Sequence, residues 1–137
     1  MSNPFLSVVI PTYNEEQRIS LTLQSVVKHL NSKEYEWEII VVDDGSNDRT
    51  TSIVEAMSEM DSGIKLLSLE HRGKGFVVKQ GILYARGKYR FVADADLSMS
   101  IDQLDRFLPP NQIDADIVIG SRETDGSKRI GEPMKRH

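Results

Sequence analysis

The 137-residue sequence contains no cysteine. This absence excludes disulfide bonds, a thiol nucleophile, cysteine-ligated zinc and iron–sulfur clusters, and it gives no sign of an oxidising compartment. A domain of this length buries roughly two-thirds of the surface that its unfolded chain exposes, so it needs no disulfide bond or structural metal to stay folded. With 39% hydrophobic and 28% charged residues, the composition is that of one ordinary globular domain.

The sequence also lacks an excess of positive charge and any long hydrophobic run. Seventeen basic and twenty-one acidic residues give a formal net charge of -4, which argues against a nucleic-acid partner or a polybasic membrane surface. No apolar run approaches the roughly 20 residues that span a bilayer, and the first residues do not resemble a signal peptide. We therefore expect a cytoplasmic chain that is not itself integral to a membrane.

Two common kinds of catalytic pattern are missing as well. The three histidines, His29, His71 and His137, have no metal-ligand spacing, and we interpret them as surface or packing residues. Gly120-Ser121 is not part of a nucleophile-elbow pattern, so a serine hydrolase has no support.

Short apolar runs alternate with segments of helical periodicity along the chain. This alternation predicts an α/β fold with a mainly parallel sheet and helices on both faces, in which ligands bind outside the carboxyl ends of the strands. Strands are expected over residues 5–10, 37–42, 64–69, 89–93 and 116–120, and helices over 15–30, 52–60, after 73–75 up to a stop at Gly87, and over 100–108.

Asp94 and Asp96 follow the fourth expected strand. If the extended backbone continues, both side chains point to one face, and a divalent metal would relieve the repulsion between the two carboxylates. Mg²⁺ or Mn²⁺ prefers carboxylate and phosphate oxygens, so the pair fits a metal site at the ligand end of the sheet. The alternative is that Asp96 begins a turn and Asp94 is solvated.

Three other loops follow strands and carry polar residues. Asp43-Asp44 follows the second strand and can accept hydrogen bonds from a ribose or a base, although an acidic turn is the favoured interpretation of these two residues taken alone. Residues 11–15 can bind a ligand or can simply form a loop and a helix cap. Residues 73–75, with Lys74 between two glycines, let the backbone approach a phosphate but lack the spacing of a P-loop.

Taken together, these segments resemble the family 2 inverting glycosyltransferases. The resemblance covers the chain from Phe5 to at least Arg122 and is greatest to the polyprenyl-phosphate branch, which includes dolichyl-phosphate glucosyltransferases and mannosyltransferases. The residues that carry it are Val8 to Glu15, Glu38 to Ser46, Arg72-Gly73-Lys74-Gly75, Ala85 to Tyr89, Asp94-Ala95-Asp96-Leu97-Ser98 and Gly120-Ser121-Arg122.

The resemblance implies a GT-A, nucleotide-diphospho-sugar transferase fold that is incomplete at its C-terminus, because the relatives are longer. Residues 1–122 would form the nucleotide-sugar-binding domain, and residues 123–137 would begin a mobile acceptor-side segment. Membrane contact would come from segments absent from this chain, which would place the full-length protein at the cytoplasmic face of a membrane.

The resemblance further implies roles for individual residues. Asp43 would hold the base, and Asp94 would face the ribose or the water shell of the metal. Asp96 would be the direct ligand of Mg²⁺ or Mn²⁺, while Ser98 stands where some relatives have a metal-binding glutamine. The donor-binding set is Pro11, Thr12, Tyr13, Glu15, Asp43, Asp44, Lys74 and Asp94. The metal ligands would be Asp96 and Asp94, and the catalytic residues Asp96 and Arg122. The acceptor phosphate would meet Arg122 and Arg136, the latter preferred to Arg129.

The activity implied is metal-dependent transfer of a hexose, with glucose from UDP-glucose expected, to a polyprenyl or dolichyl phosphate with inversion. Such a lipid phosphate is largely ionised at neutral pH and needs little help from a base. This fragment would be the donor-binding part and inactive by itself. The alternatives are a GDP-mannose-dependent polyprenyl-phosphate mannosyltransferase, a nucleotide-sugar-binding module without activity, and a nucleotidyltransferase, which the lack of a glycine-rich basic loop after the first strand disfavours.

Overall fold

The computed structural model describes residues 3–96 and 104–105 and the backbone of residues 117–119, and three helices and five strands follow one another in it. In chain order they are β1 (Leu6–Thr12), α1 (Ile19–Asn31), β2 (Trp37–Asp44), α2 (Thr50–Met60), β3 (Ile64–Leu69), α3 (Lys74–Tyr84), β4 (Tyr89–Val92) and β5 (Ile117–Ile119).

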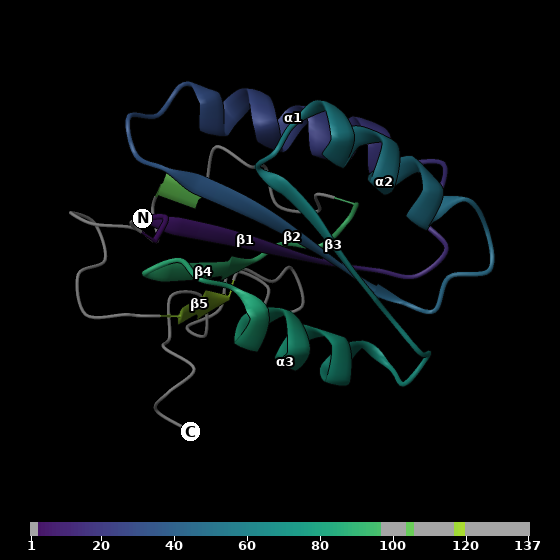
Figure 1. Cartoon of the computed structure of the whole chain (residues 1–137). Helices are drawn as coiled ribbons and strands as arrows, with labels where there is room; N and C mark the ends of the chain where they lie inside the picture. The colour runs from purple at the N-terminus through teal and green to yellow at the C-terminus, as the bar shows by residue number, and fades with distance from the viewer. Residues whose placement is uncertain (1–2, 97–103, 106–116, 120–137) are drawn as a thin grey trace.

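The strands form one sheet in the order β3-β2-β1-β4-β5, and all the strand pairs of the described residues are parallel. The chain moves outward from β1 through β2 to β3, and it then returns through α3 to β4 on the other side of β1. Because such crossovers are right-handed, this reversal places α3 on the face opposite to α1 and α2, as Figure 1 shows. The predicted α/β fold with helices on both faces is confirmed.

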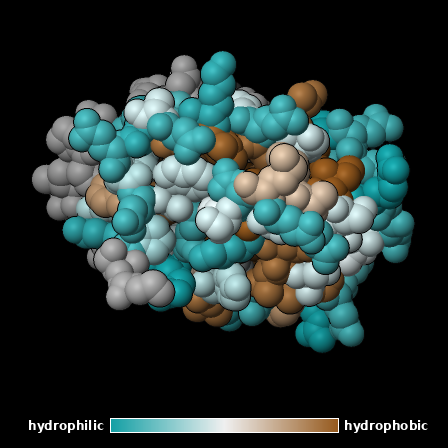
Figure 2. Space-filling view, turned by 45° about the horizontal axis from the view of Figure 1, so that its top comes forward, coloured by the Kyte–Doolittle hydropathy of each residue, from teal (hydrophilic) through white to brown (hydrophobic). Residues whose placement is uncertain are grey.

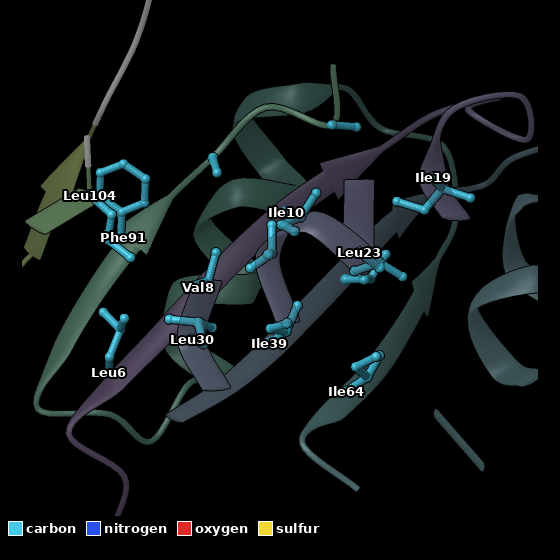
Figure 3. Packing of buried hydrophobic residues seen from close by; sticks show 14 of the residues in the cluster. Leu6, Val8, Ile10, Ile19, Leu23, Leu30, Ile39, Ile64, Phe91 and Leu104 are labelled. Atoms are coloured by element: carbon cyan, nitrogen blue, oxygen red, sulfur yellow. The ribbon is translucent and has the colours of Figure 1, made fainter. Parts of the chain in front are cut away.

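A hydrophobic core lies on each face of the sheet, and β1 contributes to both. Leu6, Val8 and Ile10 pack with residues of α1 and β2 on one face (Figure 3). Val9 packs with Val77 of α3 on the other face. Since both faces are covered, the strands are continuous apolar runs rather than alternating ones.

The helices of the first face are amphipathic. The buried residues of α1 include Ile19, Leu23, Val26 and Leu30, which recur at helical spacing. Figure 2 tilts the side of the molecule that carries α1 and α2 toward the viewer. Hydrophilic side chains cover much of this surface, with hydrophobic ones exposed among them. None of the described helices is long and apolar enough to cross a membrane.

Two strands run two residues further than the sequence predicts. β1 continues through Pro11 to Thr12, and β2 continues through Asp43 to Asp44. The amide of Ala93 donates to the carbonyl of Val9, so the backbone groups of Val9 point toward β4. Those of Pro11 point the same way, because it lies two residues further along the strand. β4 ends at Val92, and the missing N–H of Pro11 therefore leaves no ladder bond unmade.

Two helices also begin at other residues than expected. α2 begins at Thr50 rather than at residue 52, and α1 begins at Ile19 rather than at residue 15, because the amides of Glu15 and Glu16 donate to the side chains of Thr50 and Asp48 at the start of α2. The short helix expected over residues 100–108 is described only at 104–105, where Leu104 is fully buried. The segment 123–137 lies outside the described residues, and the expected domain limits at 122 and 123 stay a prediction.

Two glycines of α3 are expected to respond oppositely to alanine. A Cβ on Gly81 would lie 2.5 Å from Val42 Cγ2 and 2.6 Å from Val9 Cγ1, whereas a Cβ on Gly75 meets nothing within 4 Å. Overpacking costs about 1–3 kcal/mol, and the gain in helix propensity is about 1 kcal/mol. In urea denaturation, Gly81→Ala should lower the free energy of unfolding and Gly75→Ala should raise it; a stabilised Gly81→Ala variant would contradict this packing.

Candidate functional site

A hollow of about 240 Å³ opens at the carboxyl ends of β1 and β4. These neighbouring strands lie where the direction of the chain through the sheet reverses, which is where parallel α/β sheets bind ligands. The lining residues come from the end of β1 and the loop after it, the end of β2, the start of α3 and the loop after β4: Pro11, Thr12, Tyr13, Glu15, Asp44, Lys74, Val77, Asp94, Ala95 and Asp96.

The hollow brings together most of the side chains that the sequence singled out. Eight of the predicted site residues line it, from Pro11 to Asp96, although they are spread over more than eighty positions of the chain. Val77 and Ala95 are apolar additions that the sequence does not mark as site residues. Asp43 is not among the lining residues, and Arg122 and Arg136 lie outside the described part of the chain.

Lys74 and Asp94 face each other across the hollow. Lys74 Nζ donates to Asp94 Oδ1 at 2.7 Å, and the side chain of Asp94 is 27% exposed. The extended backbone that would put Asp94 and Asp96 on one face of a strand does not continue, because β4 ends at Val92 and residues 95–96 form a turn. Both carboxylates nevertheless line the hollow.

The donor set of the hollow fits a hard divalent cation. Mg²⁺ keeps several waters and takes one or two protein carboxylates together with substrate phosphates, and Asp94 and Asp96 supply such carboxylates. Among residues 3–96 and 104–105, no three histidine, aspartate or glutamate side chains gather into a larger metal-binding group. The position of Ser98 lies outside the described residues.

Asp43 ties β1 to the loop after β2. Its fully buried carboxylate accepts hydrogen bonds from the Thr12 hydroxyl at 2.8 Å and from both the amide and the hydroxyl of Ser46, at 2.7 and 2.6 Å. A carboxylate has about four acceptor positions, and three of them are used here. Asp43 therefore shapes the loop beside the hollow, and its expected contact with a base stays a prediction.

Asn14 fixes the loop after β1, although it is not among the predicted site residues. Its φ of 54° is in the left-handed region, which asparagine tolerates better than most residues. The Asn14 amide donates to Ser46 Oγ, and the Asn47 amide donates to Asn14 Oδ1, both at 2.8 Å. These two bonds hold the loop so that Tyr13 and Glu15, on either side of Asn14, line the hollow.

Asp44 and His71 join the loop after β2 to the loop after β3. His71 Nδ1 lies 3.0 Å from Asp44 Oδ2, and the amides of Arg72 and Gly73 donate to the same carboxylate. The imidazole stacks on the ring of Tyr13, with ring centroids 4.5 Å apart. From the sequence His71 is interpreted only as a surface or packing residue, and no spacing signal reveals this contact with the site.

Comparison with known proteins identifies the family and agrees with the fold. The family model described as Glycosyl transferase family 2 matches residues 7–137. Dolichyl-phosphate beta-glucosyltransferases of Dictyostelium discoideum and Drosophila melanogaster are 40% and 38% identical to the chain. The two alignments cover 89% and 85% of the chain. The chain spans only 41% and 40% of the length of these two relatives.

Solved structures share the architecture as well. The mannosyltransferase PcManGT from Pyrobaculum calidifontis, in complex with GDP-Man and Mn²⁺, has a TM-score of 0.57 at 29% identity, over 70% of this chain and 28% of that one. S. aureus TarS 1-349 in complex with UDP-GlcNAc has a TM-score of 0.58 at 32% identity, over 66% of this chain and 26% of that one.

Both solved structures are GT-A glycosyltransferases, so the predicted fold and the predicted family are confirmed. The chain belongs to glycosyl transferase family 2, in the dolichyl-phosphate glucosyltransferase branch.

Proposed function

We propose that the whole protein transfers glucose from UDP-glucose to a dolichyl or other polyprenyl phosphate with inversion, and that this chain binds the donor. The observation that carries the proposal is the hollow at the carboxyl ends of β1 and β4, which Asp94, Asp96, Lys74 and Tyr13 line together and in which Lys74 pairs with Asp94. Its chemistry suits a nucleoside diphosphate, and the relatives named dolichyl-phosphate beta-glucosyltransferases support the sugar and the lipid.

In this proposal Asp96 and Asp94 hold a Mg²⁺ or Mn²⁺ ion, which neutralises the charge that develops on the leaving diphosphate. PcManGT and the glucosyl-3-phosphoglycerate synthase of Mycobacterium tuberculosis, both solved with Mn²⁺, support a divalent ion. Lys74 is released from Asp94 to face a phosphate of the donor, which is a charge-assisted contact. The donor-side residues thus stabilise the same charge from two sides.

The reaction itself is a single displacement. A phosphate oxygen of the acceptor attacks the anomeric carbon on the side opposite to the nucleotide, and the bond between that carbon and the diphosphate oxygen breaks with its electron pair. The second pKa of a lipid monophosphate is about 6, so the phosphate is largely ionised at neutral pH and the step needs no dedicated base. Arg122 and Arg136, outside the described residues, are the proposed partners of the acceptor phosphate.

The site of action follows from the acceptor. A polyprenyl phosphate lies in a bilayer, so we place the whole protein at the cytoplasmic face of a membrane, with membrane contact through segments outside this chain. The chain itself would bind donor without transferring sugar.

Donor choice tests the proposal. Calorimetric titration in Mn²⁺ should show tighter binding of UDP-glucose than of GDP-mannose, because a pocket that pairs the polar edge of uracil leaves polar groups unpaired beside guanine. Tighter binding of the guanine nucleotide would replace UDP-glucose by GDP-mannose, the nucleotide sugar with which PcManGT was solved.

A sugar-transfer assay separates the enzyme from a binding module. It should use a chain extended to the length of the relatives, with UDP-[14C]glucose and dolichyl phosphate. Formation of labelled lipid only in the presence of a divalent ion would support the enzyme. If the extended chain binds the donor but transfers no sugar, the protein is a nucleotide-sugar-binding module.

A further inference from the structure

We propose that His71 is a positioning residue for the nucleobase half of the donor site: Asp44 anchors its imidazole, and the imidazole backs the ring of Tyr13. The inference rests on the proposed function, since Tyr13 lines the hollow that we assign to the donor. It gives a role to the one histidine that lies beside this hollow in the described part of the chain.

The anchor is a buried carboxylate at the end of β2. The side chain of Asp44 is 6% exposed, and both of its oxygens are used by the loop after β3. Oδ1 accepts from the amide of Arg72 at 2.7 Å, and Oδ2 accepts from the amide of Gly73 at 3.0 Å. Asp44 therefore fixes the backbone that carries His71 as well as the imidazole itself.

The imidazole is oriented by two acceptors. His71 Nδ1 lies 3.0 Å from both Asp44 Oδ2 and the backbone oxygen of Asp44. Neither oxygen can donate, so Nδ1 carries the proton and donates to this pair. The ring plane is thereby held although 59% of the side chain is exposed.

The close approach of the two loops requires glycine at position 45. Gly45 has a φ of +72°, and a Cβ built on it would lie 2.7 Å from the backbone nitrogen of His71. A side chain here would push the loop after β3 away from Asp44. The sequence Asp44-Gly45 thus supplies both the anchor and the room for His71.

Stacking on the fixed imidazole also restricts the orientation of the Tyr13 ring. The two rings are nearly parallel, at 28°, with centroids 4.5 Å apart. Tyr13 is 41% exposed, and a ring so exposed would exchange between rotamers without a partner. Aromatic rings held in one orientation are platforms for nucleobases of any identity. His71 therefore acts on the base through Tyr13 without itself lining the hollow.

Binding of UMP and of UDP to His71 variants, measured by calorimetry in Mn²⁺, tests the inference. His71→Ala should weaken both ligands by a similar factor of about two to ten, because the lost stack serves the base that they share. His71→Phe keeps a flat ring and should recover part of the loss. In a Tyr13→Ala background, His71→Ala should change neither affinity further.

The control is Glu70→Ala, the exposed neighbour in the same loop, which should leave both affinities unchanged. Unaltered affinity in His71→Ala, or an equal additional loss in the Tyr13→Ala background, would overturn the role of His71 while leaving the donor site in place. A wild-type chain that binds neither UMP nor UDP would instead overturn the proposed function, and the role of the stack with it.

Discussion

Replacing Asp96 with alanine is expected to weaken the binding of UDP in Mn²⁺ by about a hundredfold or more. Removing a group that merely orients a metal ligand already costs about 10- to 100-fold, and Asp96 is proposed as a direct ligand. Asp94 cannot substitute fully, because without Asp96 the ion keeps only one of its two proposed protein carboxylates. Calorimetry with and without Mn²⁺ measures the effect, which should be confined to the metal-dependent part of the affinity.

The control for this variant is Glu59→Ala, which removes an exposed carboxylate from α2, outside the hollow. It should bind UDP like the wild type. The thermal unfolding midpoint of Asp96→Ala should stay close to that of the wild type, because the residue lies in a turn after β4. An Asp96→Ala variant that is folded and retains Mn²⁺-dependent affinity would remove Asp96 from the site.

A second large effect is expected at the opposite end of the sheet. Glu38 is 2% exposed at the start of β2, where its carboxylate pairs with Lys65 Nζ at 2.7 Å. The same carboxylate accepts from the Ser7 hydroxyl at 2.5 Å and from the amide of Arg86 at 2.7 Å. Glu38 therefore joins three strands and the turn before β4.

Glu38→Ala should lower the free energy of unfolding by about 2–4 kcal/mol. Breaking a buried ion pair costs about 3–5 kcal/mol, and the value is discounted here because the Lys65 side chain is 38% exposed and stays partly hydrated. Urea denaturation measures the loss. Glu36→Ala, two residues earlier and exposed, is the control and should change stability little. A small effect of Glu38→Ala would show that the network adds little to the fold.

The same carboxylate makes stability depend on pH. Burial raises the pKa of Glu38, but the hydrogen bonds from Lys65, Ser7 and Arg86 outweigh it and hold the pKa below its ordinary 4.5. A lowered pKa in the folded state gives stability that is present above pH 4.5 and lost as the pH falls through the folded value. Stability of a Glu38→Gln variant should therefore fall less steeply than that of the wild type below pH 4.5.

Much of the fold could be predicted because apolar runs and helical spacing are local signals. β3 has the predicted bounds, β4 ends one residue earlier than predicted, and β5, described at Ile117–Ile119, lies within the predicted strand. The predicted start of α1 is wrong because a polar side chain elsewhere in the chain binds one of its expected first amides, as Thr50 at the start of α2 does with Glu15. Such bonds join residues 35 positions apart, and no periodicity in the sequence reports them.

The site could be predicted in part for the same reason. Strand ends are visible in the sequence, and a parallel sheet brings them to one edge, which is how Tyr13, Asp44 and Asp94 came to be expected together. The sequence does not say which of two adjacent aspartates turns inward, and Asp43 proved to bind Thr12 and Ser46 rather than line the hollow. His71 was missed because its partners lie on two other loops.

Paramagnetic broadening of amide resonances by Mn²⁺ tests the central claim most directly, which is that the hollow binds a metal–nucleotide pair. In an amide spectrum of the chain with saturating UDP, a small amount of Mn²⁺ should broaden the signals of residues 94–96 first, followed by those of Tyr13 and Lys74 across the hollow. Mg²⁺ in place of Mn²⁺ should cause shifts without broadening. Broadening centred elsewhere, or none at residues 94–96 in the presence of UDP, would contradict the account.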